Sequence, residues 1–221
     1  MQIVGFPAGM FQTNCYIVSD DAGECVIVDP GQDAEEQVRK QVSEAGLRPR
    51  AVLLTHGHLD HIWNVREVAD HYRIPAYIHP DDRAMLSDPG SALSPDLAAM
   101  LEGQTFSEPA EVIEVFDGDT LSFGSMTFDV DHVPGHSRGS VSFRVTVQTD
   151  DGPREVVLGG DVLFQDGVGR TDLPGGDAEV LMQSIAKKFL VLDDDAVVLP
   201  GHGPSTSIGR ERRANPFLRD L

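Results

Sequence analysis

Cysteine is scarce in this sequence: only Cys15 and Cys25 occur among 221 residues. They fall in two β-rich runs, NCYIVS and CVIVDP, and the turn-forming segment DDAGE between them predicts a hairpin. A symmetric turn would place Ser19 opposite Cys25 and Cys15 further along the strand pair, which makes a disulfide geometrically awkward. A chain of this length buries roughly 70–75% of its unfolded surface, so it needs no disulfide framework. We therefore expect two buried thiols.

Basic residues are also few. Lys and Arg together number 17 against 36 Asp and Glu, which gives a formal net charge of −19 at pH 7. Proteins that bind nucleic acid neutralise phosphates with Lys and Arg, and anionic membranes attract basic patches. The charge balance argues against both kinds of partner. The composition does not indicate an oligomeric state.

Long apolar runs are missing as well. No stretch approaches the roughly 18 apolar residues of a membrane span. The N-terminus, MQIVGFPAGMFQTNCY, has neither the basic region nor the continuous apolar core of a signal peptide. The composition, 40% apolar and 24% charged, is typical of globular proteins. We expect a cytoplasmic protein with a single domain over residues 1–221.

Hydrophobic patterning predicts that strands alternate with helices. Strands are expected at 2–5, 14–19, 25–28, 51–55, 77–78, 112–116, 120–123, 126–133, 140–147, 155–160 and 196–200. Helices are expected at 34–45, from about 62 to 72, and at 177–190, with a loop at 87–95 between two short helices. The strands come in two batches, each punctuated by helices. This order predicts an α/β fold in which two mixed sheets face each other and carry their helices outside.

Histidine is concentrated in one short segment. Three of the eight histidines lie in THGHLDHIW at 55–63, as His56, His58 and His61, and Asp60 stands among them. A chance match to H-x-H-x-D-H is expected on the order of once in a thousand chains of this composition. The apolar run AVLL ends just before the motif, so these side chains are predicted to lie beyond the end of a buried strand.

Three further ligand-type residues also follow predicted strands. His136 stands in PGHS, Asp161 in GGD and His202 in GHG. Strand ends at one edge of a sheet bring distant positions together, and five imidazoles with two carboxylates are costly to gather without a cation. Nitrogen and oxygen ligands suit borderline divalent metals. We expect two divalent metal ions, zinc in the first place, with iron or manganese as alternatives.

Several polar residues near these motifs have two interpretations. Asp29, in VDPG at another strand end, is either a carboxylate that supports a ligand or a turn-forming residue. Arg138 and Arg170 are the cationic residues nearest the motifs. They either bind a substrate carboxylate or form structural ion pairs. The remaining histidines are given other roles. His71 is interpreted as a helix-surface residue and His79 as a strand-end or helix-cap residue. His132 is interpreted as a structural or ligand-supporting residue.

The motifs THGHLDH, PGHSRGS, GGD and PGHG resemble those of the metallo-β-lactamase superfamily. GRTDLPGGD at 169–177, together with LPGHGPST and ERRANPFL within 199–218, is similar to the short glyoxalase II-like hydrolases. The resemblance extends from about residue 3 to 218. It implies an αββα sandwich with metals at one edge of the two sheets. It further implies that His56, His58 and His136 hold one metal, that Asp60, His61 and His202 hold the second, and that Asp161 bridges them.

The resemblance also implies a function. We predict a binuclear metal-dependent hydrolase that cleaves S-lactoylglutathione or a related low-molecular-weight thioester. A hydroxide shared by the metals would attack the carbonyl, with Asp60 as ligand and proton acceptor. The long glyoxalase II enzymes carry an additional C-terminal helical domain that contacts glutathione, and we expect it to be absent here. Segments 80–107 and 211–218 are then expected to cover the site.

Two alternatives stay open on the same scaffold. An Fe(II) persulfide dioxygenase shares the GRTD element, and by resemblance it would use only His56, His136 and Asp161. A lactone or lactam hydrolase would use both metals. Phosphodiester or RNA cleavage is opposed by the acidic charge.

Overall fold

Two six-stranded sheets face each other in the structure, a computed structural model that describes residues 1–94, 98–99, 101, 103–219 and 221. Pairing in the first sheet is antiparallel from β1 to β3 and parallel from β3 to β6. Its strands, in spatial order, are β1 (Gln2–Ala8), β2 (Thr13–Ser19), β3 (Glu24–Val28), β4 (Arg48–Leu53), β5 (Ala76–Ile78) and β6 (Val112–Glu114). This sheet is therefore mixed.

The second sheet is also mixed, because β10 and β13 pair in parallel while its other neighbours are antiparallel. Its strands, in spatial order, are β14 (Thr206–Ser207), β13 (Val197–Pro200), β10 (Gly152–Gly160), β9 (Val141–Thr149), β8 (Met126–His132) and β7 (Thr120–Phe123). A separate two-stranded hairpin consists of β11 (Leu163–Phe164) and β12 (Gly167–Val168).

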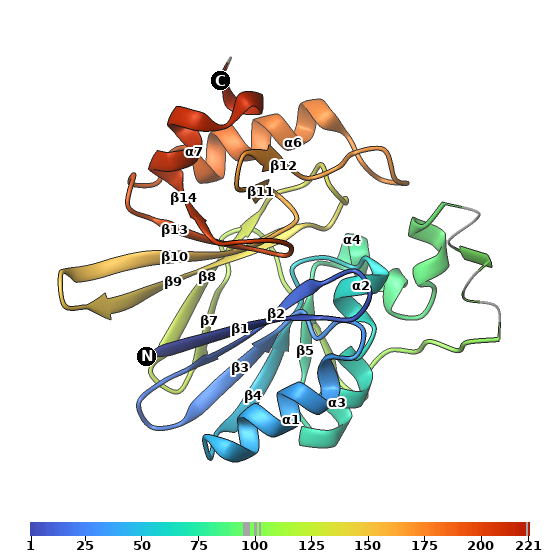
Figure 1. Ribbon diagram of the computed structural model, residues 1–221. Helices are drawn as coiled ribbons and strands as arrows, with labels where there is room; N and C mark the ends of the chain where they lie inside the picture. The colour runs from blue at the N-terminus through green and yellow to red at the C-terminus, as the bar shows by residue number, and fades with distance from the viewer. Residues whose placement is uncertain (95–97, 100, 102, 220) are drawn as a thin grey trace.

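Helices cover the outer face of each sheet (Figure 1). Helices α1 (Ala34–Glu44) and α3 (Val65–Tyr72) lie on the first sheet. On the second lie α6 (Ala178–Ser184), the π-helical turn η3 (Ile185–Phe189) and α7 (Ile208–Ala214). Shorter helices are α2 (Leu59–Ile62), α4 (Pro80–Arg83), η1 (Ala84–Leu86), η2 (Pro89–Ala92) and η4 (Pro216–Leu218). The layers run helix, sheet, sheet, helix, which confirms the predicted αββα sandwich.

Three apolar clusters fill the spaces between these layers. The central one packs side chains of both sheets together, with Val26, Phe128 and Phe143 fully buried. Another lies between the first sheet and α1 and α3, and the third lies between the second sheet and α6 and α7. Burial on both faces explains why runs such as AVLL and VVLP are continuously apolar instead of alternating. The packed sheets therefore provide a fixed scaffold, and side chains at its edge are held in defined positions.

Most predicted elements are confirmed, with shifts of a few residues at their ends. Ser19 pairs with Cys25 as predicted, and Cys15 and Cys25 are free and buried. The helix predicted from about 62 to 72 is instead two helices, α2 and α3. The reason is Asn64, which interrupts the segment and accepts a hydrogen bond through Oδ1 from the N–H of Ala34, at the start of α1.

The C-terminal part of the fold departs further from expectation. Elements β14 and α7 form where no element was predicted. The loop predicted at 87–95 contains the 3₁₀ turn η2, and residue 95 lies outside the described part of the chain. Within the described residues, no helix has the length and apolar character to cross a membrane.

Candidate metal centre

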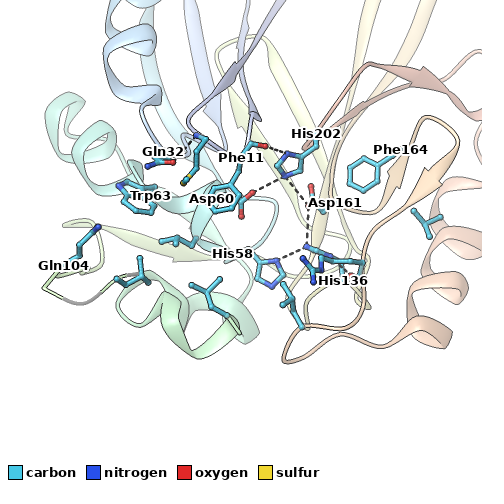
Figure 2. A pocket seen from close by; sticks show the side chains of 17 residues that line it. Phe11, Gln32, His58, Asp60, Trp63, Gln104, His136, Asp161, Phe164 and His202 are labelled. Atoms are coloured by element: carbon cyan, nitrogen blue, oxygen red, sulfur yellow. Dashed lines mark hydrogen bonds and ion pairs between the residues drawn. The ribbon is translucent and has the colours of Figure 1, made fainter. Parts of the chain in front are cut away.

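The seven predicted ligand residues come together at one edge of the two sheets. Figure 2 shows those that face the cavity: His58, Asp60, His136, Asp161 and His202. Each follows the C-terminal end of a strand: β4 precedes the THGHLDH motif, β8 precedes His136, β10 precedes Asp161 and β13 precedes His202. Three triads have ligand atoms within 4.8 Å of one another: His56, His58 and His136; His56, His61 and Asp161; Asp60, His61 and His202. The convergence expected from strand ends is therefore present.

Four of the five imidazoles are held by their outer nitrogen. In each, Nδ1 contacts an oxygen outside the cluster, so Nε2 is turned inward. The contacts are His56 to Thr55 Oγ1 at 3.1 Å, His61 to Asp29 Oδ2 at 2.9 Å, His136 to the Arg170 carbonyl at 2.7 Å and His202 to the Phe11 carbonyl at 3.1 Å. Carbonyl and carboxylate oxygens accept, and the Thr55 hydroxyl, which donates to Asp29, accepts from His56. These Nδ1 atoms therefore carry the proton and Nε2 presents a lone pair.

Several atoms that face the centre of the cluster are buried and unpaired. Among the described residues, His56 Nε2, His61 Nε2 and Asp161 Oδ1 have no hydrogen-bond partner. His61 Nε2 lies 3.5 Å from Asp161 Oδ1 and also 3.5 Å from Asp60 Oδ2. Buried polar groups without partners are rare in proteins and call for an explanation. Lone pairs of nitrogen and oxygen converging on one point fit a divalent metal, which would satisfy them all at once.

The electrostatics of the cluster suit the same purpose. Burial, with neighbouring imidazoles, lowers the pKa of His58 to about 3 and holds the pKa of His56 well below its usual value. Burial opposes ionisation of Asp60 and Asp161, yet His61 and the imidazoles around them lower the pKa of both carboxyls. His56 and His58 are therefore neutral and both carboxylates are charged near pH 7, the protonation states that metal binding requires.

His61 and His202 show the opposite effect. Burial alone would lower their pKa values, but the carboxylates of Asp60 and Asp161 outweigh it and raise both. His202 Nε2 lies 3.1 Å from Asp60 Oδ2 and 3.5 Å from Asp161 Oδ2. The two carboxylates thus attract positive charge to this point, and a metal ion is the cation that fits the whole set.

Asp29 takes the first of the two roles considered for it. Its oxygens accept from the Thr55 N–H at 2.8 Å and the Thr55 hydroxyl at 2.6 Å, and they contact His61 Nδ1 at 2.9 Å. The backbone at Asp29 is left-handed, with φ of 48°, a conformation that Asp tolerates better than most residues. The carboxylate therefore orients one ligand directly and a second through Thr55.

Asp82 is a buried acidic residue that the sequence analysis missed. It is fully buried and accepts from the Gly57 N–H at 2.9 Å, the Ser137 hydroxyl at 2.6 Å and the Gly139 N–H at 2.7 Å. Gly57 lies between two ligands and Ser137 follows a third, so one carboxylate ties the two ligand loops together. No local signal marks it, because its partners are far away in the sequence.

The three remaining histidines lie where the sequence analysis placed them. His71 is exposed on α3, and His79 caps α4 by accepting from the Asp81 N–H at 3.2 Å. His132 stacks on His79 with ring centroids 4.1 Å apart, and its Nε2 donates to the Arg138 carbonyl at 2.9 Å. These contacts give both rings structural roles.

A cavity of about 580 Å³ opens onto the ligand cluster (Figure 2). Its wall contains Arg170, whereas Arg138 is exposed and does not line it. Segment 80–107 contributes Leu93, Leu101 and Gln104, as expected. Segment 211–218 does not line the cavity, and this expectation was wrong. Its buried Glu211 instead accepts from the Asp166 N–H at 2.8 Å and braces the β11–β12 hairpin, which supplies Phe164 to the wall.

Comparison with known proteins gives a consistent result. The family model described as the metallo-beta-lactamase superfamily matches residues 8–202. An uncharacterised protein of Mycobacterium leprae is 55% identical over the full length of both chains. The probable metallo-hydrolase YqgX of Bacillus subtilis is 41% identical, covering 96% of this chain and 95% of its own. The hydroxyacylglutathione hydrolase GloC of Haemophilus influenzae is 36% identical, covering 99% and 98%.

Solved structures share the fold over almost the whole chain. The crystal structure of the BLEG-1 B3 metallo-beta-lactamase has a TM-score of 0.84 and 40% identity, covering 99% of this chain and 100% of that one. The crystal structure of TTHA1623 in a di-iron-bound form has a TM-score of 0.78 and 37% identity, covering 97% and 100%. Relatives at this similarity carry the same fold around a metal centre.

Proposed function

The chain belongs to the metallo-beta-lactamase superfamily, and from this membership and its ligand cluster we propose that it is a binuclear metal-dependent thioester hydrolase. Membership makes the chain part of a family of metallo-hydrolases. The number of metals, the scissile bond and the substrate belong to the proposal.

Two metals are favoured by the completeness of the ligand set. His56, His58 and His136 would hold one ion, Asp60, His61 and His202 the other, and Asp161 would lie between them. The second triad has its ligand atoms within 4.8 Å, as the first does. A one-iron persulfide dioxygenase would use three of these seven residues and leave His58, Asp60, His61 and His202 without a ligand role. The TTHA1623 structure, which is di-iron-bound, supports iron as an alternative to zinc.

The wall of the cavity favours a thioester as the scissile bond. When bound, two divalent ions supply a water of lowered pKa and polarise a carbonyl oxygen. Beyond the ligands, the described wall holds one ionisable residue, Arg170, which stays protonated and cannot donate a proton to a leaving group. A thiol leaves as thiolate with little help, since its pKa is about 8.5, whereas an amine requires a proton. This lack of a general acid is the observation that carries the proposal.

Asp60 and its neighbours provide the remaining chemistry. Its Oδ2 accepts from the Thr13 hydroxyl at 2.9 Å, which fixes the carboxylate at the floor of the cavity. The low pKa of Asp60, caused mainly by His61 and His202 against the effect of burial, keeps it ionised. It is therefore placed to bind a metal and to accept a proton from attacking water. GloC, at 36% identity, is named for hydrolysis of a hydroxyacylglutathione, which supports a thioester substrate here.

A lactam is the second candidate substrate, because BLEG-1 is described as a B3 metallo-beta-lactamase and is 40% identical. Its nitrogen leaving group needs a proton. The absence of a suitable donor from the described wall ranks this reaction below thioester hydrolysis.

The test is steady-state kinetics on metal-analysed protein with a thioester panel and a lactam panel. We expect two metal ions per chain and turnover of thioesters above all other classes. In the same assay, Asp161→Ala should lose at least as much activity as any single histidine variant, because a bridging carboxylate sets the metal spacing. One iron per chain with oxygen uptake on a persulfide would contradict the proposal. Two occupied metals with normal kinetics in Asp161→Ala would remove the bridging role.

A further inference from the structure

The wall of the cavity is apolar and almost without charge. Apart from the ligands, its described residues are nine apolar side chains, two amides and one guanidinium. The apolar group includes Phe11 and Trp63 on the side of the first sheet, and Phe164 beyond the centre on the other (Figure 2). The amides belong to Gln32 and Gln104, which lie on the same side as Trp63. A ligand in this space meets hydrocarbon, aromatic rings and neutral hydrogen-bonding groups.

The single cation in the wall is already neutralised. Arg170 Nε and Nη2 donate to the two oxygens of Asp172, each at 2.7 Å, in a bidentate pair. This pair uses two of the five N–H donors of Arg170 and places a compensating negative charge directly beside the guanidinium. Arg170 therefore gives little attraction to an anionic substrate while Asp172 is present.

Segment 80–107 brings no other cation to the cavity wall. Its one basic residue, Arg83, lies outside the wall and pairs with Glu108 and Glu114. The chain as a whole has a net charge of −19, so its field repels anions at a distance as well. A carboxylate entering the cavity would lose its water and find no unpaired positive side chain in the described wall, which is unfavourable.

We propose that the thioester hydrolysed by this centre has an uncharged, polar carrier thiol, held by Gln32, Gln104 and the ring of Trp63. This inference rests on the proposed thioester hydrolysis. The Met10 N–H donates to Gln32 Oε1 at 3.2 Å, which holds this amide at the wall. Amide and hydroxyl groups of a neutral carrier match such partners. The two carboxylates of glutathione do not.

The first test is a matched pair of substrates, S-lactoylglutathione and its N-acetyl diethyl ester, in which the same skeleton carries no charge at neutral pH. We expect kcat/KM to be about ten-fold higher for the ester, a difference of ~1.4 kcal/mol carried mainly by KM. Salt should lower KM for S-lactoylglutathione and leave the ester unchanged, because it screens repulsion. A low-micromolar KM for S-lactoylglutathione that rises with salt would overturn the inference.

A variant pair tests the cause. Asp172→Asn releases Arg170, so KM for S-lactoylglutathione should fall about ten-fold while KM for the ester stays constant. The control is Glu35→Gln, which removes the carboxylate that pairs with Arg39 on α1, outside the cavity wall. It should change neither KM. An unchanged KM for S-lactoylglutathione in Asp172→Asn would contradict the role given to this pair.

Binding can be followed without turnover. Trp63 is the only tryptophan of the chain and lies in the wall, so its fluorescence reports occupancy. The N-acetyl diethyl ester of glutathione should quench it at lower concentration than glutathione does. If no thioester of any carrier is hydrolysed, the proposed function fails and this inference with it. If glutathione thioesters are preferred over their esters, the inference alone fails.

Discussion

His58 differs from the other four imidazoles in how it meets the cluster. Its Nδ1 lies 2.8 Å from His136 Nε2, whereas its buried Nε2 has no partner among the described residues. Among the described residues, no hydrogen-bond partner outside the cluster holds this ring, so only a bound metal would fix its orientation. Replacing it removes a ligand while leaving the three apolar clusters intact, because the residue lies in a loop beyond β4.

We predict that His58→Ala or His136→Ala abolishes turnover and lowers metal content, with an unchanged far-UV circular dichroism spectrum. Elemental analysis of the purified variant measures the loss. The matched control is His71→Ala, which removes an exposed imidazole from α3 and should retain full metal and activity. Near-wild-type activity in either ligand variant would refute the ligand assignment.

The two thiols are predicted to be inert in the folded chain. Burial, with the nearby carboxylates of Glu24 and Asp20, raises the pKa of Cys25 from 9.0 to about 12, and burial raises that of Cys15 as well. Because the thiolate is the reactive form, a thiol reagent should modify neither residue at pH 8 and both after unfolding. The folded chain holds these protons more tightly, so their contribution to stability is complete below pH 9 and is lost as pH rises towards 12. Rapid labelling of the native chain at pH 8 would be inconsistent with this.

At the scale of elements, α4 links the two halves of the metal centre. Asp82, on this one-turn helix, binds backbone and hydroxyl groups of both ligand loops. The approach is so close that a Cβ on Gly139 would lie 2.7 Å from the carboxyl carbon of Asp82, and one on Gly57 would lie 2.8 Å from its carbonyl oxygen. Two glycines in the ligand motifs are therefore explained by contact with one residue.

Asp82→Asn should lower metal affinity about ten- to hundred-fold, the usual effect of changing a group that orients ligands. The amide NH₂ would face an N–H or hydroxyl donor, which leaves at least one loop unbound. Competition with a chromogenic chelator gives the affinity directly. Asp81→Asn is the control, since the neighbouring carboxylate is mostly exposed and should not affect metal retention. Unaltered affinity in Asp82→Asn would show that the loops hold their positions without this carboxylate.

The elements that the sequence revealed and those that it concealed differ in physical character. Long apolar runs such as AVLL predicted strands, because burial on both faces leaves a strong local signal. The break between α2 and α3 at Asn64 left no local signal, because it depends on a hydrogen bond from the distant Ala34 N–H. Ser207 caps helix α7, because its side chain accepts from the Arg210 N–H. The arginine-rich sequence of this helix instead resembles a solvent-exposed loop.

At the scale of the whole molecule, metal binding and folding are coupled. Ligands come from both sheets, and no unfolded chain presents them together, so a bound ion stabilises the native state alone. At one hundred times its dissociation constant, a ligand contributes about 2.7 kcal/mol. For a chain of 150–250 residues, Tm shifts by roughly 2–4 °C per kcal/mol. A chelator should therefore lower Tm by about 5–10 °C per ion removed. Scanning calorimetry with and without chelator measures this, and an unchanged Tm would contradict binding of metal at the sheet edge.

The ligands were predictable from the sequence, and the cavity was not. The ligand side chains are chemically distinctive and occupy strand ends, a position that patterning reveals. The wall is built from common apolar residues such as Phe11 and Phe164, more than 150 positions apart in the chain, whose meeting depends on how the β1–β2 turn and the β11–β12 hairpin pack. Glu211 shapes the wall from behind without touching the cavity, and no motif identifies such a role.

Two segments that are far apart in the sequence, the start of β2 and the loop after β13, meet at the candidate metal centre. The Asn14 N–H donates to the Gly201 carbonyl at 2.7 Å, and Thr13 forms a β-bridge with His202. During synthesis, Asp60 and His61 emerge from the ribosome long before the loop that completes their triad. The nascent chain therefore lacks part of the ligand set for most of its translation. The complete ligand set is present only when both sheets have formed and packed together. The proposed hydrolysis would therefore begin only after the last ligand loop has joined the first.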